Sequence, residues 1–411
     1  MEMLRGNTSI KKIFQNNDTW VNYHINHAPD LNWGTRWNID KMLRCKTGCG
    51  KSTYGCINCN IYRDIPYTCK SRFCSSCGKA HADNWSNEIL SDILEVEYKH
   101  LFFTVPLEFR SWFKINAKTM SEILFTAVRT SLLEYSSKRG FTPGIIMVLH
   151  TFGAAINWNP HVHIIITSGG LSEDESKWMH ERVIPHLVIK PMYKYRFLTL
   201  MAEKFNAGEL TSPAEYSAIK TSTTMNSWLT QFHRKKWFVG LGKSLKESDT
   251  PINYVARYTR RPVIAEYRIL SADNNNVTFE YHDKALNKKQ TLTYDTMKFI
   301  EELIQHIPNQ NMRIIRNCGI FANRVRTKKL TISRLVLNQK LPPKKLKLRW
   351  RESIIATFGI DPLCCPKCGK PMMLMDKLFI NTSKIKQQLY NHHMSVLDYF
   401  YDIKTSPYAN S

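Results

Sequence analysis

The sequence predicts an α+β fold with a cysteine-rich N-terminal part, a central part of strands and helices, and a basic C-terminal part. Three observations predict it. Seven of the eleven cysteines fall within residues 45–77. Apolar residues recur at helical spacing through 107–137. Within residues 161–167, alternating side chains lead into an apolar run, and this pattern is typical of a buried strand.

Composition and charge restrict the class of partner. The 411 residues are enough for roughly two or three domains. The formal net charge is +24, from 58 Lys and Arg against 34 Asp and Glu. Such an excess indicates a polyanionic partner, with nucleic acid as the first candidate and an anionic membrane surface as the second. No run approaches the roughly 20 apolar residues of a membrane span, and residues 1–6 lack a signal-peptide pattern, so we expect a soluble cytoplasmic protein.

The expected elements follow in order. Residues 1–44 are helical, a helix covers 79–97, and Tyr98–Val105 forms a strand that ends at Pro106. A helix over 107–137 is followed by breaks at Gly140 and Pro143-Gly144, and then by two strands, Ile145–Phe152 and His161–Thr167, the second ending at Gly169-Gly170.

The second half is expected to be helical over 171–250 and 252–259. Residues 263–296 alternate as a hairpin that turns at 273–276, and helical periodicity returns at 297–307. Between Arg324 and Arg351 lie 11 Lys or Arg and no acid, which favours a surface that follows phosphates. We therefore expect three domains: 1–97 helical and zinc-binding, 98–270 catalytic, and 271–411 basic and DNA-binding.

The cysteines predict structural zinc. Cys56-x2-Cys59 and Cys74-x2-Cys77 are two knuckles that together supply the four sulfurs of a tetrahedral zinc site. Cys45, Cys49 and Cys69 remain: Cys45 and Cys69 form a possible second site with a histidine such as His81, or all three are reduced thiols. The pair Cys365-x2-Cys368 has no evident further ligands except the adjacent Cys364.

A pair of histidines predicts a different metal site. In an extended strand His161 and His163 point to one face, whereas Val162 points to the core. Two imidazoles so placed form half of a divalent-metal site. The alternative is a strand whose histidines merely alternate.

Two tyrosines strengthen the metal interpretation. Tyr254 and Tyr258 are four residues apart and share one face of the expected helix, with Arg257, Arg260 and Arg261 near enough to hold phosphates. The alternative is that both rings pack against a sheet. In combination, a metal at the histidines would polarise a phosphodiester and a tyrosine would attack its phosphorus, leaving a phosphotyrosine and a free DNA hydroxyl.

Four stretches resemble one family in order along the chain. Asn159-Pro160-His161-Val162-His163, with Gly169-Gly170-Leu171 after it, resembles the His-hydrophobe-His (HUH) endonuclease motif of insertion-sequence-91-type, two-tyrosine rolling-circle transposases. Residues 45–77, 254–261 and 313–324 resemble that family's zinc segment, tyrosine helix and downstream basic segment.

The resemblance implies a central HUH nuclease domain, with a four- or five-stranded antiparallel sheet and flanking helices. It implies Tyr254 and Tyr258 as nucleophiles, and His161 and His163 as ligands of Mg²⁺ or Mn²⁺. His150 is either the third ligand or a core or supporting histidine. The partner is expected to be DNA, mainly single-stranded ends and target, at the bacterial nucleoid, with Arg324 among the contacts.

Three other functions remain open at this point. A plasmid replication initiator or relaxase would use the same chemistry. A non-catalytic zinc-containing DNA-binding regulator and a small-substrate metallohydrolase need neither tyrosine, so the tyrosine pair separates them from the nicking enzymes.

Overall fold

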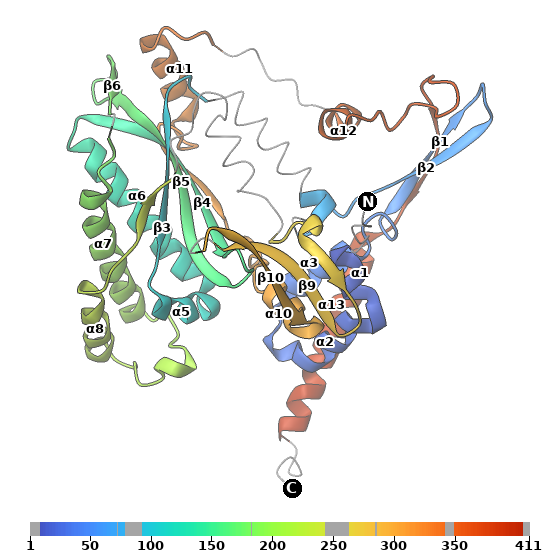
Figure 1. Cartoon of the computed structure of the whole chain (residues 1–411), viewed down its shortest axis with the longest axis horizontal. Coiled ribbons are helices and arrows are strands. Elements are labelled where there is room, and N and C mark those ends of the chain that lie inside the picture. Colours follow the sequence, from blue (N-terminus) through green and yellow to red (C-terminus); the bar gives the residue numbers. More distant parts are fainter. Residues whose placement is uncertain are drawn as a thin grey trace.

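A computed structural model describes residues 9–71, 73–78, 93–181, 183–242, 263–283, 286–341 and 349–405. The strands of these residues form three sheets, and the six-stranded one, built mainly from the middle of the chain, is named the central sheet (Figure 1). The expected α+β class, with an antiparallel sheet and flanking helices, is confirmed. No helix within the described ranges is both long and apolar enough to cross a bilayer.

The N-terminal residues form three helices, α1 (Ile10–Gln15), α2 (Thr19–His27) and α3 (Trp33–Leu43). The side chain of Ser9 caps α1 and that of Asn32 caps α3, because each accepts a hydrogen bond from a first-turn backbone N–H. Their apolar faces pack against a small sheet made of β8 (Ile269–Ala272), β9 (Asn276–Asp283) and β10 (Lys288–Asp295), and against α10 (Thr296–Ile304). The expected turn at 273–276 joins β8 to β9.

A second sheet joins the two ends of the chain. β1 (Gly50–Cys56) pairs with β2 (Ile61–Pro66) as a ribbon, and β12 (Met373–Phe379) pairs with the other edge of β1. Figure 1 shows this red C-terminal strand beside the blue ribbon, away from the central sheet. Helix α12 (Trp350–Phe358) precedes β12, and α13 (Thr382–Thr405) follows it and reaches the N-terminal helices.

The central sheet is antiparallel with strand order β11-β4-β5-β3-β7, and β6 pairs with β5. These strands are β3 (Tyr98–Thr104), β4 (Phe141–Phe152), β5 (Trp158–Ser172), β6 (Trp178–His180), β7 (Val239–Leu241) and β11 (Ile315–Gly319). Short 3-10 turns lie at Asn16–Asp18, Ala28–Asp30, Leu107–Phe109, Ala214–Tyr216, Gln231–His233 and Glu266–Arg268.

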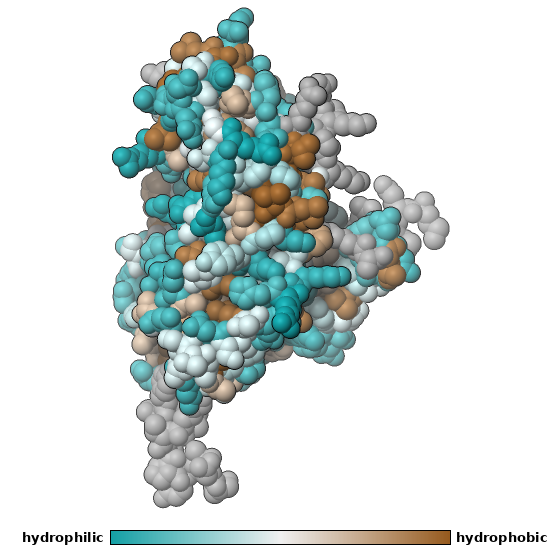
Figure 2. All heavy atoms as spheres, turned by 90° about the vertical axis from the view of Figure 1, so that its left-hand side faces the viewer, coloured by the Kyte–Doolittle hydropathy of each residue, from teal (hydrophilic) through white to brown (hydrophobic). Residues whose placement is uncertain are grey.

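Helices cover the two faces of this sheet unequally. One face packs against α5 (Arg110–Ile115), α6 (Ala117–Ser137), α7 (His186–Asn206) and α8 (Ser222–Thr230) in the main core. On the opposite face, among the residues that the structure describes, α11 (Arg326–Val336) and Phe321 cover one end, over Ile146 and Ile165. Figure 2 shows that the outer side of the molecule seen in that view is mostly hydrophilic, with scattered apolar patches, as expected for a surface exposed to water.

Several expected boundaries differ from the structure. Gly169 and Gly170 lie inside β5 instead of ending it: a Cβ on Gly169 would lie 2.0 Å from the Met179 carbonyl oxygen, and one on Gly170 2.1 Å from that of Thr142. The two glycines therefore permit close strand approach. β4 likewise runs through the expected break at 143–144, and the expected helix 107–137 is divided at Asn116.

The packing also differs from the expected division at residues 97 and 270. Residues 315–319 form the edge strand of the central sheet, 269–304 pack with the N-terminal helices, and 373–379 pair with β1. Strand pairing thus joins parts that are distant in sequence across these boundaries, and the division into 1–97, 98–270 and 271–411 stays a prediction. The expected helix at 252–259, and residues 79–92 of the one at 79–97, lie outside the described residues.

Candidate functional site

Three histidines meet on the face of the central sheet opposite to α5–α8. His150 on β4 lies opposite His161 on β5, and His163 follows two residues later on the same face. Val162 between them is completely buried in the helix-covered core, as the alternation predicts. One ring nitrogen from each histidine lies within 4.8 Å of the others, and His161 Nε2 is 3.0 Å from His163 Nε2. Two nitrogens bound at right angles to one ion, at about 2.1 Å each, would be about 3.0 Å apart.

Hydrogen bonds orient two of these rings. His161 Nδ1 is 2.6 Å from the Asn159 carbonyl oxygen, which only accepts, so Nδ1 carries the proton and Nε2 keeps its lone pair. His163 Nδ1 is 2.8 Å from Nε2 of His100, a buried residue on β3 whose ring lies nearly parallel to that of His163. Both Nε2 atoms are thereby turned toward a shared point.

His100 is a site residue that sequence reasoning missed. Its ring lies against Gly242, directly after β7, and the ring of Phe102 lies against Gly240 on β7. A Cβ on Gly242 would lie 2.0 Å from His100 Nδ1, and one on Gly240 would lie 2.1 Å from the ring of Phe102. The available signal was alternation: His100 and Phe102 are two apart on β3, and glycines two apart on a strand mark a close approach.

The tyrosines Tyr254 and Tyr258, with Arg257, Arg260 and Arg261, lie outside the described residues. The described chain on each side is close to the histidines. The Gly242 N–H donates to the His100 carbonyl oxygen at 2.8 Å, and Val263 lines the same cavity as His150.

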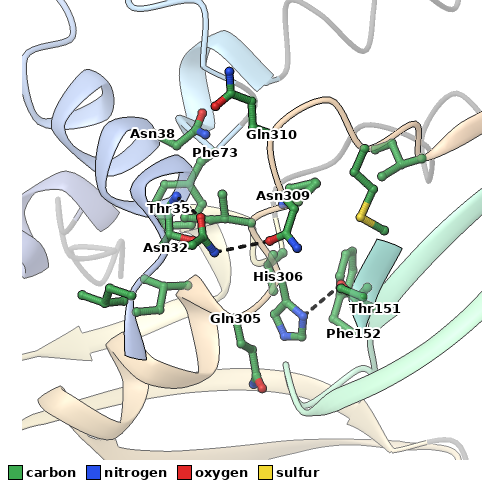
Figure 3. A pocket seen from close by; sticks show the side chains of 18 of the residues that line it. Asn32, Thr35, Asn38, Phe73, Thr151, Phe152, Gln305, His306, Asn309 and Gln310 are labelled. Atoms are coloured by element: carbon green, nitrogen blue, oxygen red, sulfur yellow. Dashed lines mark hydrogen bonds between the residues drawn. The ribbon is translucent and has the colours of Figure 1, made fainter. Parts of the chain in front are cut away.

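That cavity has a volume of about 690 Å³ and lies between the N-terminal helices and the end of β4. Figure 3 shows amide side chains of α3 and of the segment after α10 along its wall, with Asn32 donating to Asn309 at 3.3 Å. At its base, His306 lies 3.0 Å from the Thr151 hydroxyl and 2.7 Å from the Ile156 carbonyl oxygen. Burial lowers the pKa of His306 to about 4, so this histidine is neutral at pH 7.

Arg324 is exposed and lines a second cavity, together with Arg129, Arg313 and Arg316 between α6 and β11. Arg316 forms a two-pronged ion pair with Glu122. The two cavities share Asn311 and Met312, so they adjoin along the loop before β11.

The structure corrects the expected grouping of the cysteines. The expected set of Cys56, Cys59, Cys74 and Cys77 does not come together. Cys56 lies at the turn of the β1–β2 ribbon, whereas Cys74 and Cys77 come after its other end, where β2 stops. A strand of seven residues separates the two ends of the ribbon by roughly 20 Å. The actual groups are Cys45, Cys69, Cys74 and Cys77, and Cys56, Cys59, Cys365 and Cys368.

The first group is a buried four-sulfur tetrad. Cys77 Sγ lies 3.7 Å from Cys45 Sγ and 3.6 Å from Cys69 Sγ. Backbone N–H groups of Cys69 and Ser71 point at these sulfurs, at 3.5 and 3.4 Å. The neighbouring Cys69 thiol lowers the pKa of Cys45 to about 6, which favours the thiolate that binds zinc. Cys45 and Cys69 thus complete the Cys74 knuckle, and no histidine is required.

Two family models match parts of the chain that contain these groups. The family model described as a transposase zinc-binding domain matches residues 15–105, which contain the buried tetrad. The model described as a putative transposase matches residues 144–329, which contain all three histidines.

Two relatives match along most of their length. The transposase for insertion sequence element IS801 of Pseudomonas savastanoi pv. phaseolicola is 28% identical, over 89% of this chain and 88% of that protein. The putative transposase y4qJ of Sinorhizobium fredii is 25% identical, over 87% of this chain and 92% of the relative. No solved structure matches the chain. With a structural zinc domain, a central antiparallel sheet and relatives over nearly its whole length, the chain belongs to the transposases of the insertion-sequence-91 type.

Proposed function

We propose that this transposase cuts and rejoins single-stranded DNA through a 5′-phosphotyrosine intermediate, in rolling-circle transposition of an insertion sequence. The observation that carries the proposal is the group of His150, His161 and His163 on two paired strands, with His100 behind it. Tyr254 and Tyr258 are proposed as the nucleophiles.

The three imidazoles fit a divalent ion. They supply three nitrogen ligands from one face of a rigid sheet, which leaves other coordination positions for water and phosphate oxygens. Mg²⁺ prefers oxygen ligands and keeps several waters, so nitrogen donors favour Mn²⁺ over Mg²⁺ here. When bound, the ion would act as a Lewis acid on the scissile phosphate.

The chain itself would supply the nucleophile. A tyrosine Oη attacks phosphorus, the bond from phosphorus to the 3′ oxygen breaks, and the leaving strand takes a proton as a free 3′ hydroxyl. Rejoining reverses these steps: a 3′ hydroxyl attacks the phosphotyrosine, and the tyrosine is released with its proton. Two tyrosines would permit two such transfers. Support comes from the described neighbours, because Gly242 bonds to His100 and Val263 lines the cavity with His150.

The two adjoining cavities offer a path for the strand. The first includes His150 and carries amide groups and Lys41, Lys70 and Lys114, and the acids among its described lining residues are Asp30 and Glu301. The second carries four arginines, and Arg324 is the proposed DNA contact within it. Amides suit unstacked bases and arginines suit phosphates, so the order of the two cavities is consistent with a single strand.

The test is a covalent-trapping assay. The full chain is incubated with labelled single-stranded DNA containing the element's own ends, with Mn²⁺ or Mg²⁺, and then denatured. We expect a labelled adduct from the wild type and from Tyr267→Phe, an exposed control tyrosine. We expect none from the Tyr254→Phe, Tyr258→Phe double variant. An adduct of unchanged yield in the double variant, or no nicking by the wild type, would overturn the proposal.

A further inference from the structure

The second cysteine group joins the two ends of the chain. Cys56 and Cys59 lie at the turn of the β1–β2 ribbon, and Cys365 and Cys368 precede β12. The four sulfurs lie within 4.8 Å of one another, and Cys56 Sγ is 3.6 Å from Cys368 Sγ. Sulfurs that bind one tetrahedral zinc at 2.3 Å lie about 3.8 Å apart, whereas a disulfide needs about 2.05 Å. The spacing is therefore that of a metal site.

The backbones of the two pairs are similar. The residue directly after each second cysteine has positive φ: 51° at Asn60 and 71° at Gly369. Within each pair a turn hydrogen bond starts at the first cysteine, whose carbonyl oxygen accepts from Cys59 N–H in one and from Gly369 N–H in the other. Two matching knuckles that face each other form a closed site, which leaves no position for substrate.

The sheet around this tetrad has almost no apolar core. Every residue of β12 is exposed, including Met373, Leu378 and Phe379. Within the described part of the chain, the buried cluster consists of Cys56, Cys365 and Met372, with Tyr54 and Cys59 at its edge. Burial of so few side chains stabilises a sheet weakly, and small folds of this kind are typically held by a metal.

We propose that Cys56, Cys59, Cys365 and Cys368 bind a second structural zinc ion, and that this zinc fastens the C-terminal segment 364–379 onto the N-terminal ribbon. The proposal does not depend on the nicking chemistry. A second attachment follows in α13, where His393 Nδ1 lies 3.1 Å from the buried His24 Nε2 of α2. The zinc thus closes the chain on itself and places α13 on the N-terminal helices.

The first test counts zinc. The full chain is purified in zinc and dialysed, and bound zinc per chain is measured by native mass spectrometry. We expect Cys365→Ser/Cys368→Ser and Cys56→Ser/Cys59→Ser each to bind one ion fewer than the wild type. Cys364→Ser, which changes the adjacent thiol outside the tetrad, should bind the same number as the wild type. An equal count in the wild type and both double variants would overturn the proposal.

The second test uses the wild type alone, so it holds even if a variant misfolds. Cys368 is exposed and Cys364 is partly exposed, so N-ethylmaleimide can reach both thiols. Zinc bound to Cys368 would protect that thiol and leave Cys364 reactive. We expect Cys364 to be alkylated at least about tenfold faster than Cys368 in the zinc-loaded chain, and chelation to remove the difference. Alkylation of Cys368 as fast as Cys364 before chelation would contradict the zinc site.

Discussion

His100 provides the sharpest test of how the histidine site is built. Its Nε2 is 2.8 Å from His163 Nδ1, and its ring is buried and lies nearly parallel to that of His163. Replacing a group that orients a metal ligand typically costs 10- to 100-fold in metal affinity. We therefore expect His100→Leu to weaken Mn²⁺ binding by about 10- to 100-fold, or about 1.4 to 2.7 kcal/mol.

A conservative variant separates orientation from packing. In His100→Gln the amide can occupy the position of Nε2, so we expect it to keep most of the affinity that His100→Leu loses. Binding is measured by isothermal titration of the full chain with Mn²⁺, and His282→Leu, on an exposed histidine of β9, is the control. An orienting role of His100 is refuted if His100→Leu remains folded and binds Mn²⁺ as tightly as the wild type, or if His100→Gln loses as much affinity as His100→Leu.

Three further predictions concern pH, DNA and packing. The pKa of His306 is lowered from 6.5 to about 4 by burial, so the unfolded chain takes the proton first as pH falls. The free energy of unfolding is therefore unaffected by this group above pH 6.5 and falls by up to about 3 kcal/mol toward pH 4. In His306→Gln, the free energy of unfolding measured with denaturant should depend less on pH over this range. Arg324→Ala should weaken single-stranded DNA binding and reduce the slope of log affinity against log salt by about 0.7, measured by fluorescence anisotropy; an unchanged slope would exclude a phosphate contact. Gly170→Ala should destabilise the chain by about 1–3 kcal/mol, since its Cβ would meet the Thr142 carbonyl at 2.1 Å, whereas Gly48→Ala meets only the flexible Arg44 side chain; equal melting temperatures would contradict this.

Local patterns predicted the part of the site that lies on one strand. His161, Val162 and His163 alternate as the sequence indicates, because a strand has a fixed period of two residues. His150 was recognisable only as a candidate, since its place opposite His161 depends on the register of β4 against β5. His100 was not found, because nothing in its own neighbourhood shows that β3 lies on the other side of β5.

The expected grouping of the cysteines is wrong for the same reason, because it too depends on tertiary structure. Cys56-x2-Cys59 and Cys74-x2-Cys77 are close in sequence, and proximity along the chain favoured pairing them. The ribbon between them is extended, however, and extension separates its ends by more than a metal site allows. The partners of Cys56 instead come from residues about 300 positions away, through the pairing of β1 with β12.

All three candidate metal-binding groups therefore have the same construction. Each begins with two ligands two or three residues apart, whose spacing is set by a strand or a tight turn, and each is completed by residues brought in by tertiary structure. The completing residues are His150 for the histidine group, Cys45 and Cys69 for the buried tetrad, and Cys365 and Cys368 for the ribbon tetrad. A half-site holds an ion weakly, because the missing ligands must be supplied by water. Binding of metal at each group consequently requires a different part of the tertiary structure, so the number of ions bound reports which of those parts have assembled.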